Sequence, residues 1–66
     1  MKTTPIEVPI PDWAKCVAQD RDGSWWAYEI TPKPEREDRW NAHHGKHEFI
    51  ANSAPNPNWR ETLRRV

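Results

Sequence analysis

The sequence predicts a small α+β domain that is mostly β: a three-stranded antiparallel meander with a short C-terminal helix packed on one face. Two strand-like runs flank a turn rich in Asp and Gly, and a third run of similar composition follows later in the chain. The last residues repeat apolar side chains at helical spacing. About three strands make the smallest sheet that is stable by itself, so these elements suffice for one domain.

The composition favours a folded chain with an aromatic core. Only 35% of the 66 residues are hydrophobic, and the mean hydropathy is -1.13. A core of this size rarely contributes more than roughly 3–5 kcal/mol. Five Trp nevertheless argue against disorder, because each aromatic ring buries about 150–250 Å². We expect residues 1–12, which contain three prolines, to form an extended arm, and residues 13–66 to form the single domain.

The first two strands form a predicted hairpin. Trp13–Gln19 reads as one strand and Ser24–Ile30 as the next. Between them, Asp20–Gly23 has the composition of a turn, because Asp bonds its own backbone and Gly accepts positive φ. A strand, an Asp-x-Asp-Gly turn and a strand together predict an antiparallel hairpin.

The adjacent Trp25 and Trp26 must lie on opposite faces of this second strand. Trp26 shares its face with Ser24, Tyr28 and Ile30, and this is the more apolar side, so we assign it to the core. The residues expected above it are Phe49 or Ile50, Trp59 and Leu63.

Trp25 then lies among small and polar neighbours, and two readings stay open. In one, the N-terminal arm or Trp40 folds over Trp25. In the other, Trp25 is exposed and anchors a partner, since Trp is enriched at interface hot spots. A charged run beside it would supply the rim. The expected partner contacts are therefore Trp25, Trp40, Glu35, Arg36, Glu37, Asp38 and Arg39.

The second half of the chain supplies the remaining elements. Residues 31–39 read as an exposed, Pro-broken loop, and Lys46–Asn52 reads as the third strand. In the tail, Asn58 and Glu61 fit a capping box that starts a short helix. Its apolar stripe is Trp59, Leu63 and Val66, which must dock on the sheet because two turns of helix are unstable alone.

The charge balance limits the classes of partner. Ten basic and ten acidic residues cancel, so no overall field attracts nucleic acid or an acidic membrane. The exposed cations expected on the tail, Arg60, Arg64 and Arg65, keep a small nucleic-acid-binding module as an alternative. A single Cys16 excludes an internal disulfide, and no run resembles a signal sequence or a membrane span. We expect a cytoplasmic protein and no membrane partner.

The candidates for chemistry are few. His43, His44, His47 and Cys16 are residue types that bind zinc, but they lack the paired spacing of zinc signatures. We read them as a polar turn and a buried thiol, and we expect no metal and no cofactor. Cys16 lies between Ala14 and Ala18 on a strand, where a thiol usually packs rather than reacts. With no phosphate-binding loop and no nucleophile–base spacing, we expect a protein that is not an enzyme.

Two resemblances bear on function. The Trp spacing over residues 13–40 is loosely similar to a WW domain, a meander that binds Pro-rich peptides, but the Pro expected after Trp40 is absent. The segment "DWAKCVAQDRDGSWWAYEITP" (residues 12–32), with its W-A-K-x-x-A-x-D-x-D-G-x-W-W-x-Y-E pattern, resembles small proteins of tailed bacteriophages and prophages. That resemblance covers about a third of the chain and implies no site residues.

The phage resemblance implies a context for the protein. Small phage proteins commonly bind one host protein, as takeover factors or inhibitors of host defence. We therefore expect an interaction protein that binds a bacterial host protein, in the host cytoplasm, and inhibits or modulates it. A nucleic-acid-binding module and a virion or assembly accessory protein are the alternatives, and a homo-oligomer is left open.

Overall fold

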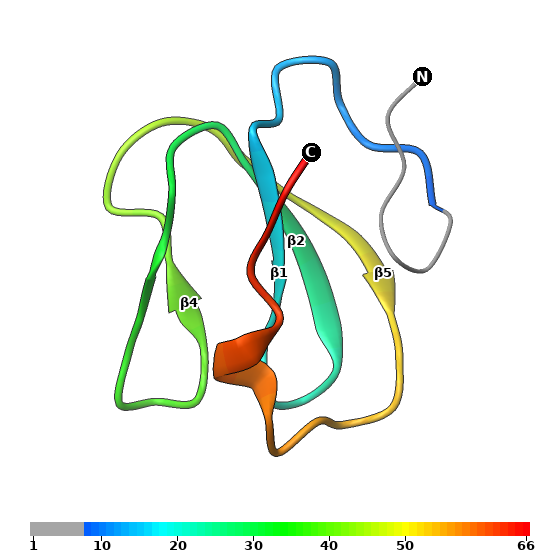
Figure 1. Ribbon diagram of the computed structural model, residues 1–66, viewed down its shortest axis with the longest axis vertical. Coiled ribbons are helices and arrows are strands. Elements are labelled where there is room, and N and C mark those ends of the chain that lie inside the picture. The colour runs from blue at the N-terminus through cyan, green and yellow to red at the C-terminus, as the bar shows by residue number, and fades with distance from the viewer. Residues whose placement is uncertain (1–7) are drawn as a thin grey trace.

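A computed structural model describes residues 8–66 and arranges them as short strands in two antiparallel sheets (Figure 1). The larger sheet has the strand order β5-β2-β1-β6, and the smaller pairs β3 with β4. The elements are β1 (Cys16–Gln19), β2 (Ser24–Tyr28), β3 (Lys33–Pro34), β4 (Trp40–Asn41), β5 (His47–Asn52), the 3-10 turn η1 (Trp59–Glu61) and β6 (Arg64–Arg65).

The predicted hairpin is present, with shorter strands than expected. β1 and β2 pair antiparallel, from Cys16 opposite Tyr28 to Gln19 opposite Trp25. In the turn, the Asp22 carboxylate accepts the Ser24 backbone N–H at 2.9 Å. Gly23 has φ of 100°, a value that L side chains rarely adopt. The turn chemistry read from the sequence therefore forms this hairpin.

The predicted fold class is wrong. The main sheet has four strands rather than three, a second sheet is present, and no α-helix occurs in residues 8–66. The segment expected to be a C-terminal helix is the single turn Trp59–Glu61, followed by β6 on the open edge of β1. Asn58, the expected helix cap, makes no side-chain capping bond.

Pairing with β1 explains why the tail is extended rather than helical. The Thr62 hydroxyl accepts the Gln19 N–H at 2.8 Å, and the Val66 N–H donates to the Lys15 carbonyl at 3.1 Å. These bonds satisfy backbone groups that a bare sheet edge leaves unpaired. A helix of two turns offers only its own marginal bonds. The expected docking of Trp59 and Leu63 on the sheet does occur, since both pack in one core cluster.

The charged run at residues 31–39 is partly ordered as a hairpin. β3 and β4 pair antiparallel, with Lys33 opposite Asn41 and Pro34 opposite Trp40. The Glu35 N–H donates to the Arg39 carbonyl at 2.9 Å and closes the tip. Pro has no backbone N–H to donate, so within sheets it is found on edge strands. Pro34 is compatible with β3 because both strands of a two-stranded sheet are edge strands.

A bulge in β5 decides which face its aromatic residue occupies. Trp25 pairs with Ala51, whereas the next residue, Trp26, pairs with Phe49. Ile50 is therefore the extra residue. In a regular strand Phe49 and Ala51 would share a face. The bulge instead turns Phe49 to the side of Trp26, and Ile50 packs towards Trp25.

Both faces of β2 are covered, so the protein has two small cores. On one face, Trp25 packs with Ile10, Ala14, Val17 and Ala27, and only 7% of its surface is exposed. The other face carries Cys16, Ala18, Tyr28, Trp40 and Trp59, with Trp26 at its margin. The predicted core on the Trp26 and Tyr28 face is present, but the expectation of a single core is wrong, and so is the reading in which Trp25 is exposed.

Ile10 shows how the start of the chain contributes to the Trp25 core. Of the arm expected at residues 1–12, residues 1–7 lie outside the described residues, while Ile10 is buried against the Trp25 cluster. Trp13, Ile50 and Val66 close the cluster from other sides. Of the two readings of Trp25, the structure supports the covered one.

No helix in residues 8–66 has the length and apolar character needed to cross a lipid bilayer.

Candidate functional site

Four aromatic side chains from β2 and β5 form a continuous row, which we call the aromatic row: Phe49, Trp26, His47 and Tyr28. The Trp26 ring lies 5.8 Å from Phe49, nearly edge to face, and 5.6 Å from His47. His47 stacks on Tyr28 at 6.5 Å. The row follows from the strand register, because Trp26 is opposite Phe49 and Tyr28 is opposite His47.

The aromatic row runs from the core to the surface. Tyr28 is buried and Trp26 is partly buried, whereas His47 is exposed and Phe49 is 47% exposed. A single exposed apolar side chain is common, as Ile30 shows at 48%, but exposed aromatic residues that are grouped mark interaction surfaces more often than isolated ones do. Among residues 8–66 nothing covers this end of the row.

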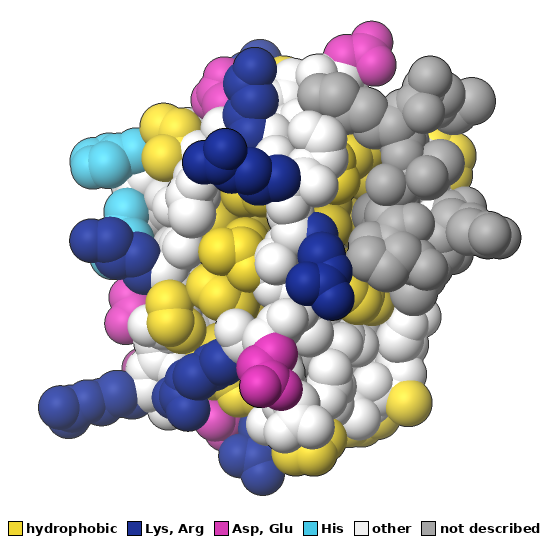
Figure 2. All heavy atoms as spheres, viewed as in Figure 1, with side chains coloured by type: hydrophobic (Ala, Val, Ile, Leu, Met, Phe, Trp, Pro, Cys, Tyr) yellow, Lys and Arg dark blue, Asp and Glu magenta, His cyan; other side chains and the backbone are white. Residues whose placement is uncertain are grey.

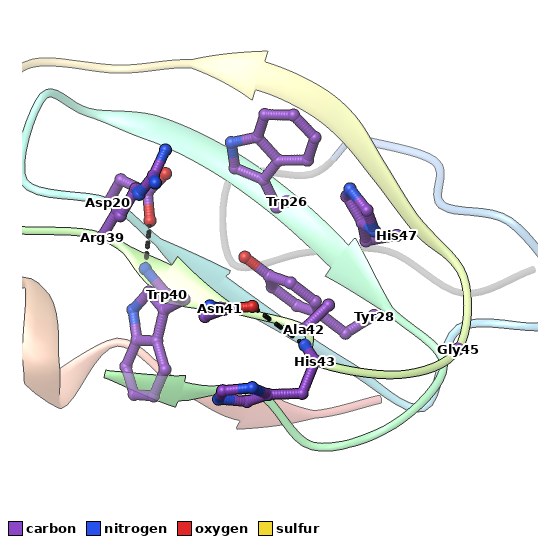
Figure 3. A pocket seen from close by; sticks show the side chains of 10 residues that line it. All are labelled: Asp20, Trp26, Tyr28, Arg39, Trp40, Asn41, Ala42, His43, Gly45 and His47. Carbon is purple, nitrogen blue, oxygen red and sulfur yellow. Dashed lines mark hydrogen bonds between the residues drawn. The ribbon is translucent and has the colours of Figure 1, made fainter. Parts of the chain in front are cut away.

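A hollow of about 370 Å³ lies between the aromatic row and the segment 39–45, and we call it the Trp26 hollow. Trp26, Tyr28 and His47 form one wall, and Trp40–His43 with Gly45 form the other (Figure 3). Asp20 and Arg39 lie at one end. The volume falls within the usual range of small-ligand sites, about 300–1,000 Å³.

Trp40 is a fixed part of this wall. Its indole N–H donates to the Gln19 carbonyl at 3.0 Å, and its ring meets Trp59 edge to face at 5.8 Å. Its backbone N–H donates to the Asp20 carboxylate at 2.7 Å. Because Trp40 is buried and held at three points, its main contribution is structural, and only the side that lines the hollow is available to a partner.

The titratable groups of the hollow are shifted by burial. Burial raises the pKa of Asp20, and the hydrogen bond from Trp40 opposes this only in part. Burial also raises the pKa of Tyr28 well above its ordinary value, with a further contribution from the negative charge of Asp20. Tyr28 is therefore a neutral phenol at physiological pH, and the charged form of Asp20 is poorly solvated.

The predicted charged rim, Glu35–Arg39, borders this site rather than Trp25. Glu37, Asp38 and Arg39 line a second depression that also contacts Trp26. Arg39 pairs with Glu37 at 3.0 Å, and Asp38 pairs with Arg21 at 3.4 Å. Arg36 is exposed, and Glu35 accepts a bond from Asn41. The loop thus lies beside Trp26, the residue that the sequence predicts to be in the core.

The predicted metal candidates do not come together. Among the described residues, no three His, Cys, Asp or Glu side chains are grouped as metal ligands. Cys16 is buried in the core, and burial raises the pKa of its thiol. His43 lies 3.6 Å from Glu35, His44 is exposed, and His47 belongs to the aromatic row.

The sequence did not indicate Trp26, Phe49 or Asp20 as site residues, and it indicated His47 only as a weak metal candidate. The alternation of β2 separated the two tryptophans correctly, but it did not reveal which face is covered completely. The exposed end of the aromatic row depends on the bulge at Ile50, and no local sequence pattern predicts that bulge. One usable signal was Ala18, because a small residue opposite Trp26 leaves the ring without a bulky neighbour across the hairpin.

Comparison of the chain with protein-family models, with curated proteins and with solved structures finds no match.

Proposed function

We propose that this chain is a small interaction protein that binds another protein through the outer end of the aromatic row, centred on Trp26 and Phe49. The observation that carries the proposal is the exposure of Phe49 beside the partly buried Trp26 at the edge of a hollow. Aromatic residues of this kind anchor protein interfaces because they bury much area with little loss of side-chain freedom.

The charged loop 35–39 completes the surface. Its tip borders Trp26, and its ion pairs are exposed, so they contribute little to stability. Charges around an aromatic centre instead select a partner and speed association. The resemblance of residues 12–32 to small phage proteins supports a bacterial host protein as the partner, and inhibition or modulation of that protein as the outcome.

A nucleic acid is the less favourable partner for this surface. Asp20 and Asp22 border Trp26 and would repel a phosphate backbone. Arg60, Arg64 and Arg65 are exposed elsewhere, at η1 and β6. On the face that carries these elements, Lys and Arg side chains are mixed with Asp and Glu (Figure 2). Arg60 already stacks on Trp59 at 4.7 Å.

The test compares two neighbouring exposed positions of β5. Phe49→Ser removes the aromatic anchor, and Glu48→Ser changes the next residue, which lies on the opposite face. Proteins captured from a bacterial lysate by the unchanged chain are identified by mass spectrometry and purified. Their affinity for the unchanged chain and for each variant is then measured by calorimetry.

We expect Phe49→Ser to weaken binding about ten-fold or more, as for an interface anchor, and Glu48→Ser to change it less than about two-fold. A purified partner that binds both variants as tightly as the unchanged chain contradicts the proposal. So does the failure of every captured protein to bind once purified.

A further inference from the structure

Trp26 lines two depressions, and the second of these is rich in charge. Besides the Trp26 hollow, it lines a depression that it shares with four carboxylates and two guanidinium groups. The carboxylates are Asp20, Asp22, Glu37 and Asp38, and the cations are Arg21 and Arg39.

The ion pairs leave an excess of negative charge beside the indole. Arg21 pairs with Asp38, and Arg39 pairs with Glu37. Asp20 and Asp22 form no ion pair among residues 8–66. Within the described part of the chain, Asp22 accepts hydrogen bonds only from Ser24. One oxygen of Asp20 accepts the Trp40 N–H, and no described residue donates to the other. Arg39 also attracts Asp20 at longer range, but the depression still holds four carboxylates and two guanidinium groups, so its net charge beside the aromatic ring is negative.

We propose that Trp26, Asp20 and Asp22 form a receptor for an arginine side chain of the partner protein. The inference rests on the proposed function and specifies the chemistry that the surface recognises. A guanidinium is planar, so it stacks on an indole face and still donates from its edge to carboxylates. Complementary charge selects this occupant, because the site offers two carboxylate acceptors and an electron-rich ring, while its two cations, Arg21 and Arg39, pair with Asp38 and Glu37.

The protein already contains one contact of this type. The Arg60 guanidinium lies 4.7 Å from the centre of the Trp59 ring. Arg39 does not occupy the equivalent place on Trp26, because the cation–ring contacts among residues 8–66 are those of Lys46 with Trp13 and Arg60 with Trp59. Its guanidinium is instead held by Glu37. The face of Trp26 thus remains available to an arginine from outside.

The test uses three peptides that differ at one residue. The probe is acetyl-Gly-Ser-Arg-Ser-Gly-amide. In one control, citrulline, a neutral isostere, replaces the arginine, and in the other lysine replaces it. Each is titrated into the isotope-labelled chain, and the indole N–H signal of Trp26, assigned with Trp26→Phe, is followed by NMR. We expect a saturable shift with a Kd of about 1–10 mM for the arginine peptide, at least about ten-fold weaker binding of citrulline, and weaker binding of lysine.

Two variants test the carboxylates without disturbing the turn. Asp20→Asn and Asp22→Asn keep an oxygen that accepts the Trp40 or Ser24 N–H, and they remove the charge. Each should weaken arginine binding about three-fold or more, whereas Glu48→Gln on the opposite face should leave it unchanged. Equal binding of the citrulline or lysine peptide, no saturable shift up to about 20 mM, or unaltered binding by both Asn variants overturns the proposal.

The same variants separate this inference from the proposed function. A purified partner that loses affinity with Phe49→Ser but not with either Asn variant uses the aromatic row without the arginine receptor. That result refutes the inference and leaves the proposed function intact. Loss of affinity in all three variants, with none in Glu48→Gln, supports both.

Discussion

Replacement of Trp25 by Ala should unfold most of the protein. Trp25 is 7% exposed and packs against Ile10, Val17 and Ala27. Among the described residues, this core contains no other large buried ring. Removal of a buried Trp costs about 3–5 kcal/mol. Its indole nitrogen has no acceptor among residues 8–66, so loss of that unpaired donor offsets part of the cost, and we expect about 3–4 kcal/mol.

That loss is comparable to the whole stability of a chain of this size. At about 0.05–0.15 kcal/mol per residue, 66 residues are stabilised by about 3–10 kcal/mol, and small cores lie at the lower end. With a urea dependence near 1 kcal/mol per molar, the unfolding midpoint of Trp25→Ala should fall by about 3–4 M. Urea titration followed by far-UV circular dichroism measures this.

The matched control is Phe49→Ala. Because Phe49 is 47% exposed, its truncation should cost no more than about 1 kcal/mol, which shifts the midpoint by about 1 M or less. A Trp25→Ala midpoint as close to that of the unchanged chain as the Phe49→Ala midpoint would refute the assignment of Trp25 to a core.

Three further predictions concern the turn, the buried amide and the half-buried carboxylate. Gly23→Ala should cost at least about 2 kcal/mol by urea titration, because a Cβ would lie 2.0 Å from the Ser53 carbonyl oxygen. Gly45→Ala, whose Cβ would meet the side chains of Ile30 and Glu29 rather than backbone, should cost about 1 kcal/mol; equal costs would argue against the close approach at Gly23. Gln19→Leu should cost about 1–3 kcal/mol, since it leaves the Asn56 amide without its acceptor and the Gly23 carbonyl with only the Ser53 N–H as a donor; an unchanged midpoint would show that these bonds contribute nothing. Asp20→Asn should be at least as stable as the unchanged chain at pH 7. Because folding raises the pKa of Asp20, the folded state is destabilised as the pH rises and the carboxyl ionises, and the variant lacks this ionisation. The difference in melting temperature should vanish below about pH 3.9, where Asp20 is protonated in both states, and a larger difference at low pH would contradict the reasoning.

The parts of the fold that local chemistry determines were predictable. The hairpin of β1 and β2 depends on Asp22 and Gly23, whose roles in a turn are visible in four residues of sequence. The strand at β5 was also predicted within one residue of its start. In each case the pattern acts over a few residues, and no distant partner changes the outcome.

The tail shows why the fold class was predicted wrongly. Asn58, Glu61 and the apolar spacing are compatible with a helix in isolation, yet Arg64 and Arg65 pair with β1, more than 40 residues away in sequence. The stabilisation comes from the open edge of β1, which a local pattern does not represent. Where tertiary pairing competes with a marginal helix, propensity does not decide the structure.

The candidate site was misplaced for a related reason. Alternation states that Trp25 and Trp26 lie on opposite faces, but burial depends on what covers each face. Ile10 covers Trp25 from the start of the chain, and the bulge at Ile50 directs Phe49 towards Trp26. Both causes are non-local, so the exposed aromatic residue could not be identified from the strand alone.

Site-specific crosslinking tests the central claim, that the Trp26 and Phe49 end of the aromatic row is the binding surface, most directly. Benzoylphenylalanine is introduced in place of Phe49 in one sample and in place of Glu48, its neighbour on the opposite face, in another, and bacterial cells expressing each are irradiated. We expect a discrete crosslinked partner from position 49 and none from position 48. A crosslink to the same partner from position 48 alone, or no crosslink from position 49, would contradict it.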